Sequence, residues 1–185
     1  MEKRLNPVDS KDLERAITFL VDYMNTSGHN PKPVILHSIL TGMKLLGYGY
    51  RKELVIAGLL HDVLEDSDAK ESDINSLFGE EVTKLVKALT FKEEIRYDVN
   101  KYINAVKQKI NAGKDACIID TADRFTNLPY IVLAQNNELF YWLIKKAELS
   151  IKMEKDLLKY EAIYKDLKKE FNKVKKQELL KPGSF

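Results

Sequence analysis

The sequence has few of the features that mark secreted or membrane proteins. It contains one cysteine, Cys117, which excludes an internal disulfide framework and is typical of a reducing cytoplasm. The start "MEKRLNPVDSKD" has no apolar signal core, and no hydrophobic run approaches the length that spans a membrane. We therefore expect a cytoplasmic protein with no membrane partner.

Neither sign of charge is in excess. The chain has 30 basic and 28 acidic residues, and these interleave along the sequence. Nucleic-acid binders usually concentrate basic residues on one face, so we expect no nucleic-acid partner. A hydrophobic content of 44% over 185 residues is ordinary for a globular protein and sufficient for a core. We expect one domain over 1–185, with a core at about 10–160.

Proline and glycine fall mainly between segments of helical periodicity, and no segment shows the alternation of a strand. The predicted fold class is therefore all-α. The expected helices cover 9–25, 34–47, 54–65, 73–78, 80–90, 99–110, 115–128 and, as one helix or two, 138–176. Pro33 opens the second of these helices, Gly79 separates two short ones, and Pro129 closes the helix before it. The segment 54–65 is hydrophobic nearly all round, so it should be a central, buried helix.

The stretch "LLHDVLEDSD" ends an apolar run with four ionisable groups, His61, Asp62, Glu65 and Asp66. On a continuous helix these side chains would share an arc of roughly 140°. Three carboxylates buried together are costly unless a cation compensates them. A surface helix end could carry the same residues, so this stretch alone does not establish a metal site.

The chain has three histidines, which limits the sites that imidazole could build. His61 lies beside Asp62, and His37 lies mid-helix among apolar residues. A single histidine on such a helix is more often a core residue than a ligand. His29, beside glycine and asparagine, is expected to be an exposed loop residue.

A second polar group lies in "CIIDTADRFTNL". Asp120, Asp123, Arg124 and Asn127 share a helical stripe of roughly 100°, and apolar residues fill most of the remainder. Such a stripe is usually a solvent face. Two acidic stripes and a histidine on a third helix nevertheless provide the mixed nitrogen and oxygen ligands that suit Mn²⁺, Fe²⁺, Co²⁺ or Zn²⁺.

These residues resemble, in order and spacing, the HD superfamily of metal-dependent phosphohydrolases. The superfamily has a histidine, then His-Asp, then a distant aspartate, which match His37, His61-Asp62 and Asp123. The sequence is more similar still to the hydrolase domain of RelA/SpoT alarmone enzymes and their small stand-alone relatives. "AGLLHDVLEDSD", "FGEEVTKLVKALT" and "TADRFTNL" carry this resemblance, which covers roughly Ala16 to Tyr160.

The resemblance implies a role for each matched position. The implied metal ligands are His37, His61, Asp62 and Asp123; the implied catalytic acids are Glu65 and Asp66; the substrate-binding candidates are Asn127, Lys32 and Arg124. The implied cofactor is a divalent metal ion, with Mn²⁺ as the leading candidate. The implied substrate is a nucleotide or a related phosphate ester, with loss of the 3′-pyrophosphate of guanosine tetraphosphate as the leading reaction.

Four departures from the alarmone hydrolases lie around the substrate. The Arg-Lys segment before the first histidine is reduced to Lys32, and Ser38 replaces a proline. Asp120 stands where lysine is usual, and Pro129 stands where a basic residue is common. We therefore expect poorer handling of guanosine tetraphosphate than in a typical alarmone hydrolase. A nucleoside monophosphatase, another small-molecule phosphatase and a non-catalytic nucleotide-sensing HD module stay open as alternatives.

The C-terminal tail carries a heptad-like apolar seam. It consists of Met153, Leu157, Tyr160, Tyr164, Leu167, Phe171 and Val174. Three heptads are short for an independent coiled coil, so the favoured expectation is a helix that packs on its own core. The alternative is a homodimer contact through this helix.

Overall fold

The structure is a computed structural model that describes residues 7–24, 33–91, 97–132, 134 and 137–179. Every regular element within these ranges is a helix, which confirms the all-α prediction. None of these helices has the length and apolar content needed to cross a membrane. The chain divides into two compact units, 1–93 and 94–185, which are described separately. The prediction of a single domain over 1–185 stays a prediction.

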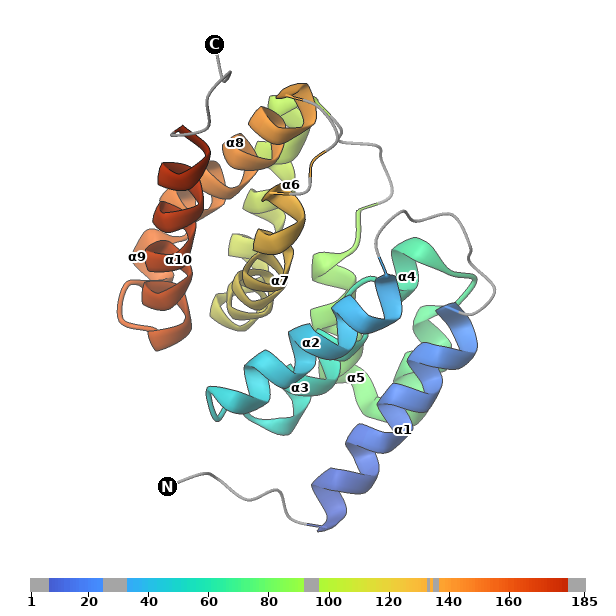
Figure 1. Ribbon diagram of the computed structural model, residues 1–185. Coiled ribbons are helices and arrows are strands. Elements are labelled where there is room, and N and C mark those ends of the chain that lie inside the picture. The colour runs from blue at the N-terminus through green and yellow to red at the C-terminus, as the bar shows by residue number, and fades with distance from the viewer. Residues whose placement is uncertain (1–6, 25–32, 92–96, 133, 135–136, 180–185) are drawn as a thin grey trace. The chain divides into compact units, whose positions relative to one another are not determined.

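The first unit is built around a short central helix. Its elements are α1 (Pro7–Met24), α2 (Val34–Gly47), α3 (Lys52–Leu59), α4 (Val63–Asp66) and α5 (Glu71–Leu89). α3 contacts α1, α2 and α5 (Figure 1), and its residues from Leu54 to Leu59 are all buried. The predicted central helix is therefore confirmed, because a helix that is apolar on all sides can bury its surface only by packing among other helices.

The break after Leu59 was not predicted. A single helix was expected over 54–65, but α3 ends at Leu59 and α4 begins at Val63. The carbonyl of Gly58 accepts a hydrogen bond from His61 Nδ1 at 2.8 Å, where a continuous helix would present the N–H of Asp62. A side-chain donor thus takes the place of the next backbone donor, and the helix stops.

Gly79 separates two helical segments as predicted. α5 is continuous from Glu71 to Leu89 except at Gly79, whose φ of 84° and ψ of 172° are not helical. A left-handed φ favours glycine, which lacks the Cβ that would clash there. The chain therefore changes direction between the two expected short helices.

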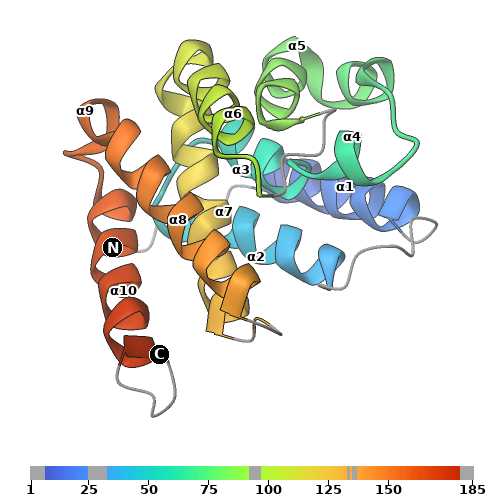
Figure 2. The same ribbon diagram turned by 90° about the horizontal axis from the view of Figure 1, so that it is seen from above.

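The second unit is built around α7. Its elements are α6 (Val99–Ala112), α7 (Lys114–Val132), α8 (Asn137–Met153), α9 (Lys155–Leu158) and α10 (Ala162–Leu179). α7 contacts the other four helices of this unit (Figure 2). Asp98 caps α6 by accepting hydrogen bonds from the N–H groups of Asn100 and Lys101, at 2.9 and 3.0 Å.

Pro129 does not end its helix, contrary to the prediction. α7 continues to Val132, with Pro129 inside its last turn. The neighbouring Leu128 and Ile131 are buried in a cluster with Ile144, and this packing holds the turn after the proline. A proline this close to a C-terminus removes one backbone donor without interrupting a long run of later turns.

The C-terminal seam is divided between elements. One helix or two were expected over 138–176, but the chain there forms α8, α9 and α10, with breaks after Met153 and after Leu158. Tyr160, beyond the second break, is 80% exposed. Leu167 and Phe171 are buried in the second unit's own cluster. The expectation that the tail packs on its own core is confirmed for α10, whereas a homodimer contact stays a prediction.

Candidate metal and phosphate site

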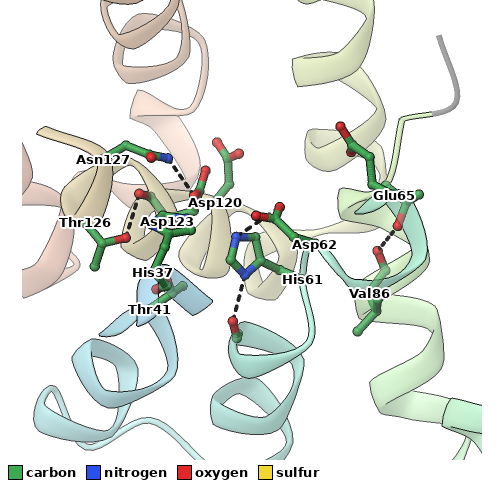
Figure 3. Close-up of polar contacts among 12 residues, drawn as sticks. His37, Thr41, His61, Asp62, Glu65, Val86, Asp120, Asp123, Thr126 and Asn127 are labelled. Carbon is green, nitrogen blue, oxygen red and sulfur yellow. Dashed lines mark hydrogen bonds and ion pairs between the residues drawn. The ribbon is translucent and has the colours of Figure 1, made fainter. Parts of the chain in front are cut away.

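His37 and His61 lie side by side in the first unit. His37 is on α2 and His61 follows α3; both are buried (Figure 3). Their ring centroids are 5.3 Å apart with planes at 67°, and one ring nitrogen of each lies within 4.8 Å of the other. Two imidazoles at this separation can serve one ion.

Two glycines allow α2 and α3 to approach closely enough for this pairing. A Cβ on Gly42 would lie 2.5 Å from Leu59 Cγ, and a Cβ on Gly58 would lie 2.4 Å from Leu45 Cδ1. Larger residues would therefore push the helices apart. The separation of the two imidazoles depends on small residues that lie outside the histidine motif.

The tautomer of His61 follows from its backbone contact. A carbonyl oxygen can only accept, so Nδ1 of His61 carries the proton that bonds to Gly58 O at 2.8 Å. Nε2 then faces Asp62 Oδ1 at 3.1 Å. Adjacent residues on a continuous helix would not face one another, so the turn after Leu59 creates this contact.

This arrangement fits a divalent cation. In the neutral tautomer, the Nε2 lone pair of His61 and the Asp62 carboxylate would repel one another unless a positive charge lay near both. Nitrogen and carboxylate oxygen donors form the ligand set of first-row divalent metals. The donors of the first unit alone therefore meet the chemical requirement for part of a metal site.

Glu65 and Asp66 belong to the short helix α4. The Asp66 N–H and the Glu65 N–H both bond to the carbonyl of Asp62, at 2.9 and 3.1 Å. Glu65 is exposed, and its Oε2 accepts a hydrogen bond from the N–H of Phe91 at 3.2 Å. Asp66 is half-buried. The two predicted catalytic acids thus follow the candidate ligands by one turn.

Asp123 and Asn127 lie together on α7 in the second unit. Asn127 Nδ2 donates to Asp123 Oδ1 at 2.7 Å (Figure 3), and both side chains are half-buried. An amide donor on one oxygen fixes the orientation of the carboxylate. Asn127, predicted as a substrate contact, therefore also orients a predicted metal ligand.

Asp120 is a buried structural residue. It is 1% exposed, and its carboxylate is ion-paired with Lys109 of α6 and with Arg124 of its own helix. Although burial opposes ionisation, Arg124 and Lys109 lower the pKa of Asp120 to about 2. The negative charge expected beside the substrate is thus compensated inside the unit, so Asp120 offers no uncompensated charge that would repel an alarmone.

Arg124 is engaged in the same buried network. Its guanidinium donates to Asp120 and, through Nη1, to the hydroxyl of Tyr102 at 2.5 Å, and Arg124 is 8% exposed. Its predicted contact with substrate stays a prediction. Lys32 falls outside the described residues, as does His29. Ser38 is fully buried, and its hydroxyl forms no hydrogen bond with any residue that the structure describes.

Glu154 is a member of the network that sequence reasoning missed. It is 1% exposed between α8 and α9. Burial and the adjacent Asp120 carboxylate raise the pKa of Glu154 well above its usual range. No local pattern marks Glu154 or Lys109, since their shared partner is distant in sequence.

Comparison with known proteins identifies the family of this chain. A family model described as HD domain matches residues 16–139. The guanosine-3′,5′-bis(diphosphate) 3′-pyrophosphohydrolase of Aquifex aeolicus is 32% identical over 133 residues, which cover 69% of this chain and 19% of the relative. The Drosophila melanogaster pyrophosphohydrolase MESH1 is 37% identical over 78 residues, which cover 40% of this chain and 41% of the relative. The chain thus spans about a fifth of the Aquifex relative.

Two solved structures share the fold. One, described as a metazoan ortholog of SpoT that hydrolyzes ppGpp, has a TM-score of 0.75 at 19% identity and covers 95% of this chain and 98% of its own. Another, from Listeria monocytogenes EGD-e, has a TM-score of 0.63 at 20% identity and covers 78% of this chain and 99% of its own. The family match includes the histidine pair, the acids of α4 and the Asp123 segment. The chain belongs to the HD domain family.

Proposed function

We propose that this chain is a metal-dependent phosphohydrolase that releases pyrophosphate from the 3′ position of guanosine tetraphosphate or a closely related nucleotide. The observation that carries the proposal is the orientation of His61, with Nδ1 bonded to Gly58 O and Nε2 facing the Asp62 carboxylate. The names of the Aquifex and Drosophila relatives support the substrate. Compensation of Asp120 by Lys109 and Arg124 removes one objection to it.

The proposed metal ligands are His37, His61, Asp62 and Asp123. The first three come from one unit, and the fourth is assigned by its match to the family pattern. When bound, a divalent cation lowers the pKa of water and offsets charge on phosphoryl oxygens. Mn²⁺ is the ion that we propose to test first, because the nitrogen and oxygen donors suit it.

Glu65 and Asp66 are proposed to orient the attacking water and to accept its proton. Their place on α4 follows Asp62 directly, and the bond from the Phe91 N–H restrains the Glu65 carboxylate. A carboxylate restrained in this way can act as a general base without holding the metal. Asn127 is proposed to support Asp123 through its 2.7 Å hydrogen bond.

The test is a product-release screen. The protein is treated with a chelator and then reloaded with Mn²⁺, Co²⁺, Mg²⁺ or Zn²⁺, and pyrophosphate and phosphate are measured separately. We expect pyrophosphate from guanosine tetraphosphate with a transition metal and none after chelation. Phosphate from nucleoside monophosphates would instead identify a monophosphatase, and nucleotide binding without either product would identify a sensing module.

We propose that the chain acts on a small molecule in the cytoplasm and binds no nucleic acid, because its charges are balanced at 30 basic and 28 acidic residues. A homodimer through α10 would appear as a doubled mass in light scattering. A single-chain mass at micromolar concentration would remove that proposal.

A further inference from the structure

Lys146 occupies a defined position on the second unit. It lies on α8, and its Nζ is 5.1 Å from the centroid of the Tyr102 ring. A lysine over an aromatic face is held there by the attraction between its charge and the ring quadrupole. Lys146 lies beyond residues 16–139, so the family match assigns it no role.

Tyr102 is itself held on several sides. Its hydroxyl accepts from Arg124 Nη1 at 2.5 Å and lies 2.7 Å from Ser150 Oγ. Its ring packs edge-on against Trp142 at 6.0 Å between centroids. The platform beneath Lys146 is therefore rigid, and the ammonium group is positioned before any ligand arrives.

Lys146 differs from Lys109 and Arg124 because no carboxylate in the described part of the chain pairs with it. Asp120 engages both Lys109 and Arg124, whereas no Asp or Glu oxygen among the described residues lies within 4.0 Å of Lys146 Nζ. Lys146 is nevertheless half-buried. A partly desolvated ammonium without a counterion is unfavourable unless another anion can occupy the site.

The charges around Lys146 also support an anion-binding site there. Burial lowers the pKa of Lys146 to about 8, with further lowering by Arg124 and Lys109, while Asp123 and Asp120 act in the opposite direction. The charges that face Lys146 thus come from α6 and α7 and include the proposed ligand Asp123. Lysines perturbed in this way occur frequently at functional sites.

We propose that Lys146 binds a phosphoryl oxygen of the substrate beside Asp123. This inference rests on the proposed function, and the ligand class is a nucleotide with an anionic phosphoryl or pyrophosphoryl group. Lys109 and Arg124 cannot bind the phosphoryl group while both are ion-paired with Asp120. Lys146 keeps its ammonium available because Tyr102 contributes a neutral ring face.

The test compares Lys146→Met with Lys145→Met. Methionine keeps the length and packing of the lysine stem, and Lys145 is an exposed neighbour on the same helix. In the Mn²⁺-loaded protein we expect Lys146→Met to raise KM for guanosine tetraphosphate about ten- to a hundredfold, the loss typical of one charge-assisted hydrogen bond. Lys145→Met should keep the KM of the unaltered chain. Mn²⁺ affinity, measured by titration without nucleotide, should be equal in all three proteins.

A second variant separates charge from packing. Lys146→Arg keeps the positive charge over the ring, so it should retain most of the affinity for the nucleotide. If Lys146→Met weakened binding only by disturbing the packing, Lys146→Arg would weaken it as well. Equal KM values for Lys146→Met and Lys145→Met would overturn the proposal. If the unaltered chain turns over no nucleotide, the proposed function fails. Direct titration with guanosine tetraphosphate then decides whether Lys146 binds the nucleotide. Weaker binding in Lys146→Met alone would support Lys146, and equal binding would overturn it.

Discussion

Glu65 and His61 are expected to differ in what their removal does. Glu65→Gln removes a proton acceptor but no ligand, so kcat should fall at least tenfold while Mn²⁺ still binds. His61→Ala removes the proposed metal-coordinating nitrogen, Nε2, which lies 3.1 Å from Asp62 Oδ1. Both metal binding and turnover should therefore be lost. Metal titration and steady-state kinetics on both variants check this. Loss of metal from Glu65→Gln equal to that from His61→Ala would contradict the division of roles.

Asp120 illustrates how a residue's environment changes the meaning of a substitution. Sequence comparison alone suggests that Asp120→Lys would restore a family cation and improve alarmone turnover. The buried contacts with Lys109 and Arg124 predict the opposite, since three cations would then share one desolvated site. We expect a loss of about 3–5 kcal/mol in the free energy of unfolding.

Urea unfolding measures this loss, with the exposed Asp68→Lys as the control. Asp68→Lys introduces the same charge change at a solvated position, where an effect below about 0.5 kcal/mol is usual. A folded Asp120→Lys protein with the stability of the control and improved turnover would restore the original interpretation.

Glu154 should make stability depend on pH. Its folded-state pKa is raised, so its contribution is fully present below the unfolded pKa and is lost as pH rises through the folded value. The free energy of unfolding should therefore fall with rising pH above about 4.5, by at most about 1.4 kcal/mol per pH unit from this group. Glu154→Gln, which keeps the size of the side chain but cannot ionise, should flatten this slope in denaturant titrations at several pH values. An unchanged slope would show that Glu154 ionises normally, and the exposed Glu138→Gln serves as the control.

At the scale of elements, the close crossing of α2 and α3 controls the histidine pair. Gly42→Ala would place a Cβ 2.5 Å from Leu59 Cγ and 3.2 Å from the Val55 carbonyl oxygen, and Leu59 is fully buried. We expect the helices to separate, with a cost of about 1–3 kcal/mol in stability and weaker Mn²⁺ binding.

Gly47→Ala is the matched control on the same helix, because a Cβ there meets nothing within 4 Å. Thermal unfolding and metal titration of the two variants give the comparison. If Gly42→Ala binds Mn²⁺ as tightly as Gly47→Ala, the glycine crossing does not position the imidazoles.

For the whole molecule, metal should act as a stabilising ligand. A cation that binds only the folded chain adds RT ln(1 + [L]/Kd) to stability, or about 2.7 kcal/mol at a concentration of one hundred times Kd. Tm should rise with Mn²⁺ in the unaltered protein and stay constant in His61→Ala. Scanning calorimetry with and without chelator provides the measurement. A Tm rise of equal size in His61→Ala would indicate that the stabilising ion binds elsewhere.

The sequence by itself determined the all-α fold class and the family. Apolar residues predicted α2 and the central α3, and the glycine itself predicted the break at Gly79, because both signals are local properties of a single segment. The order of the histidines and aspartates likewise identified the HD pattern, which the family match confirms. Helical periodicity depends on neighbours within a few turns, whereas the HD pattern is recognised from the order of residues spread from His37 to Asp123.

Tertiary structure decided which polar groups meet. The turn that aims His61 at Asp62 depends on a side chain that competes for the Gly58 carbonyl. The pairing of Lys109 with Asp120, and the position of Lys146 on Tyr102, join residues from different helices that no periodic pattern relates. Burial then sets their charges, because desolvation and partner distance exist only once the chain has folded.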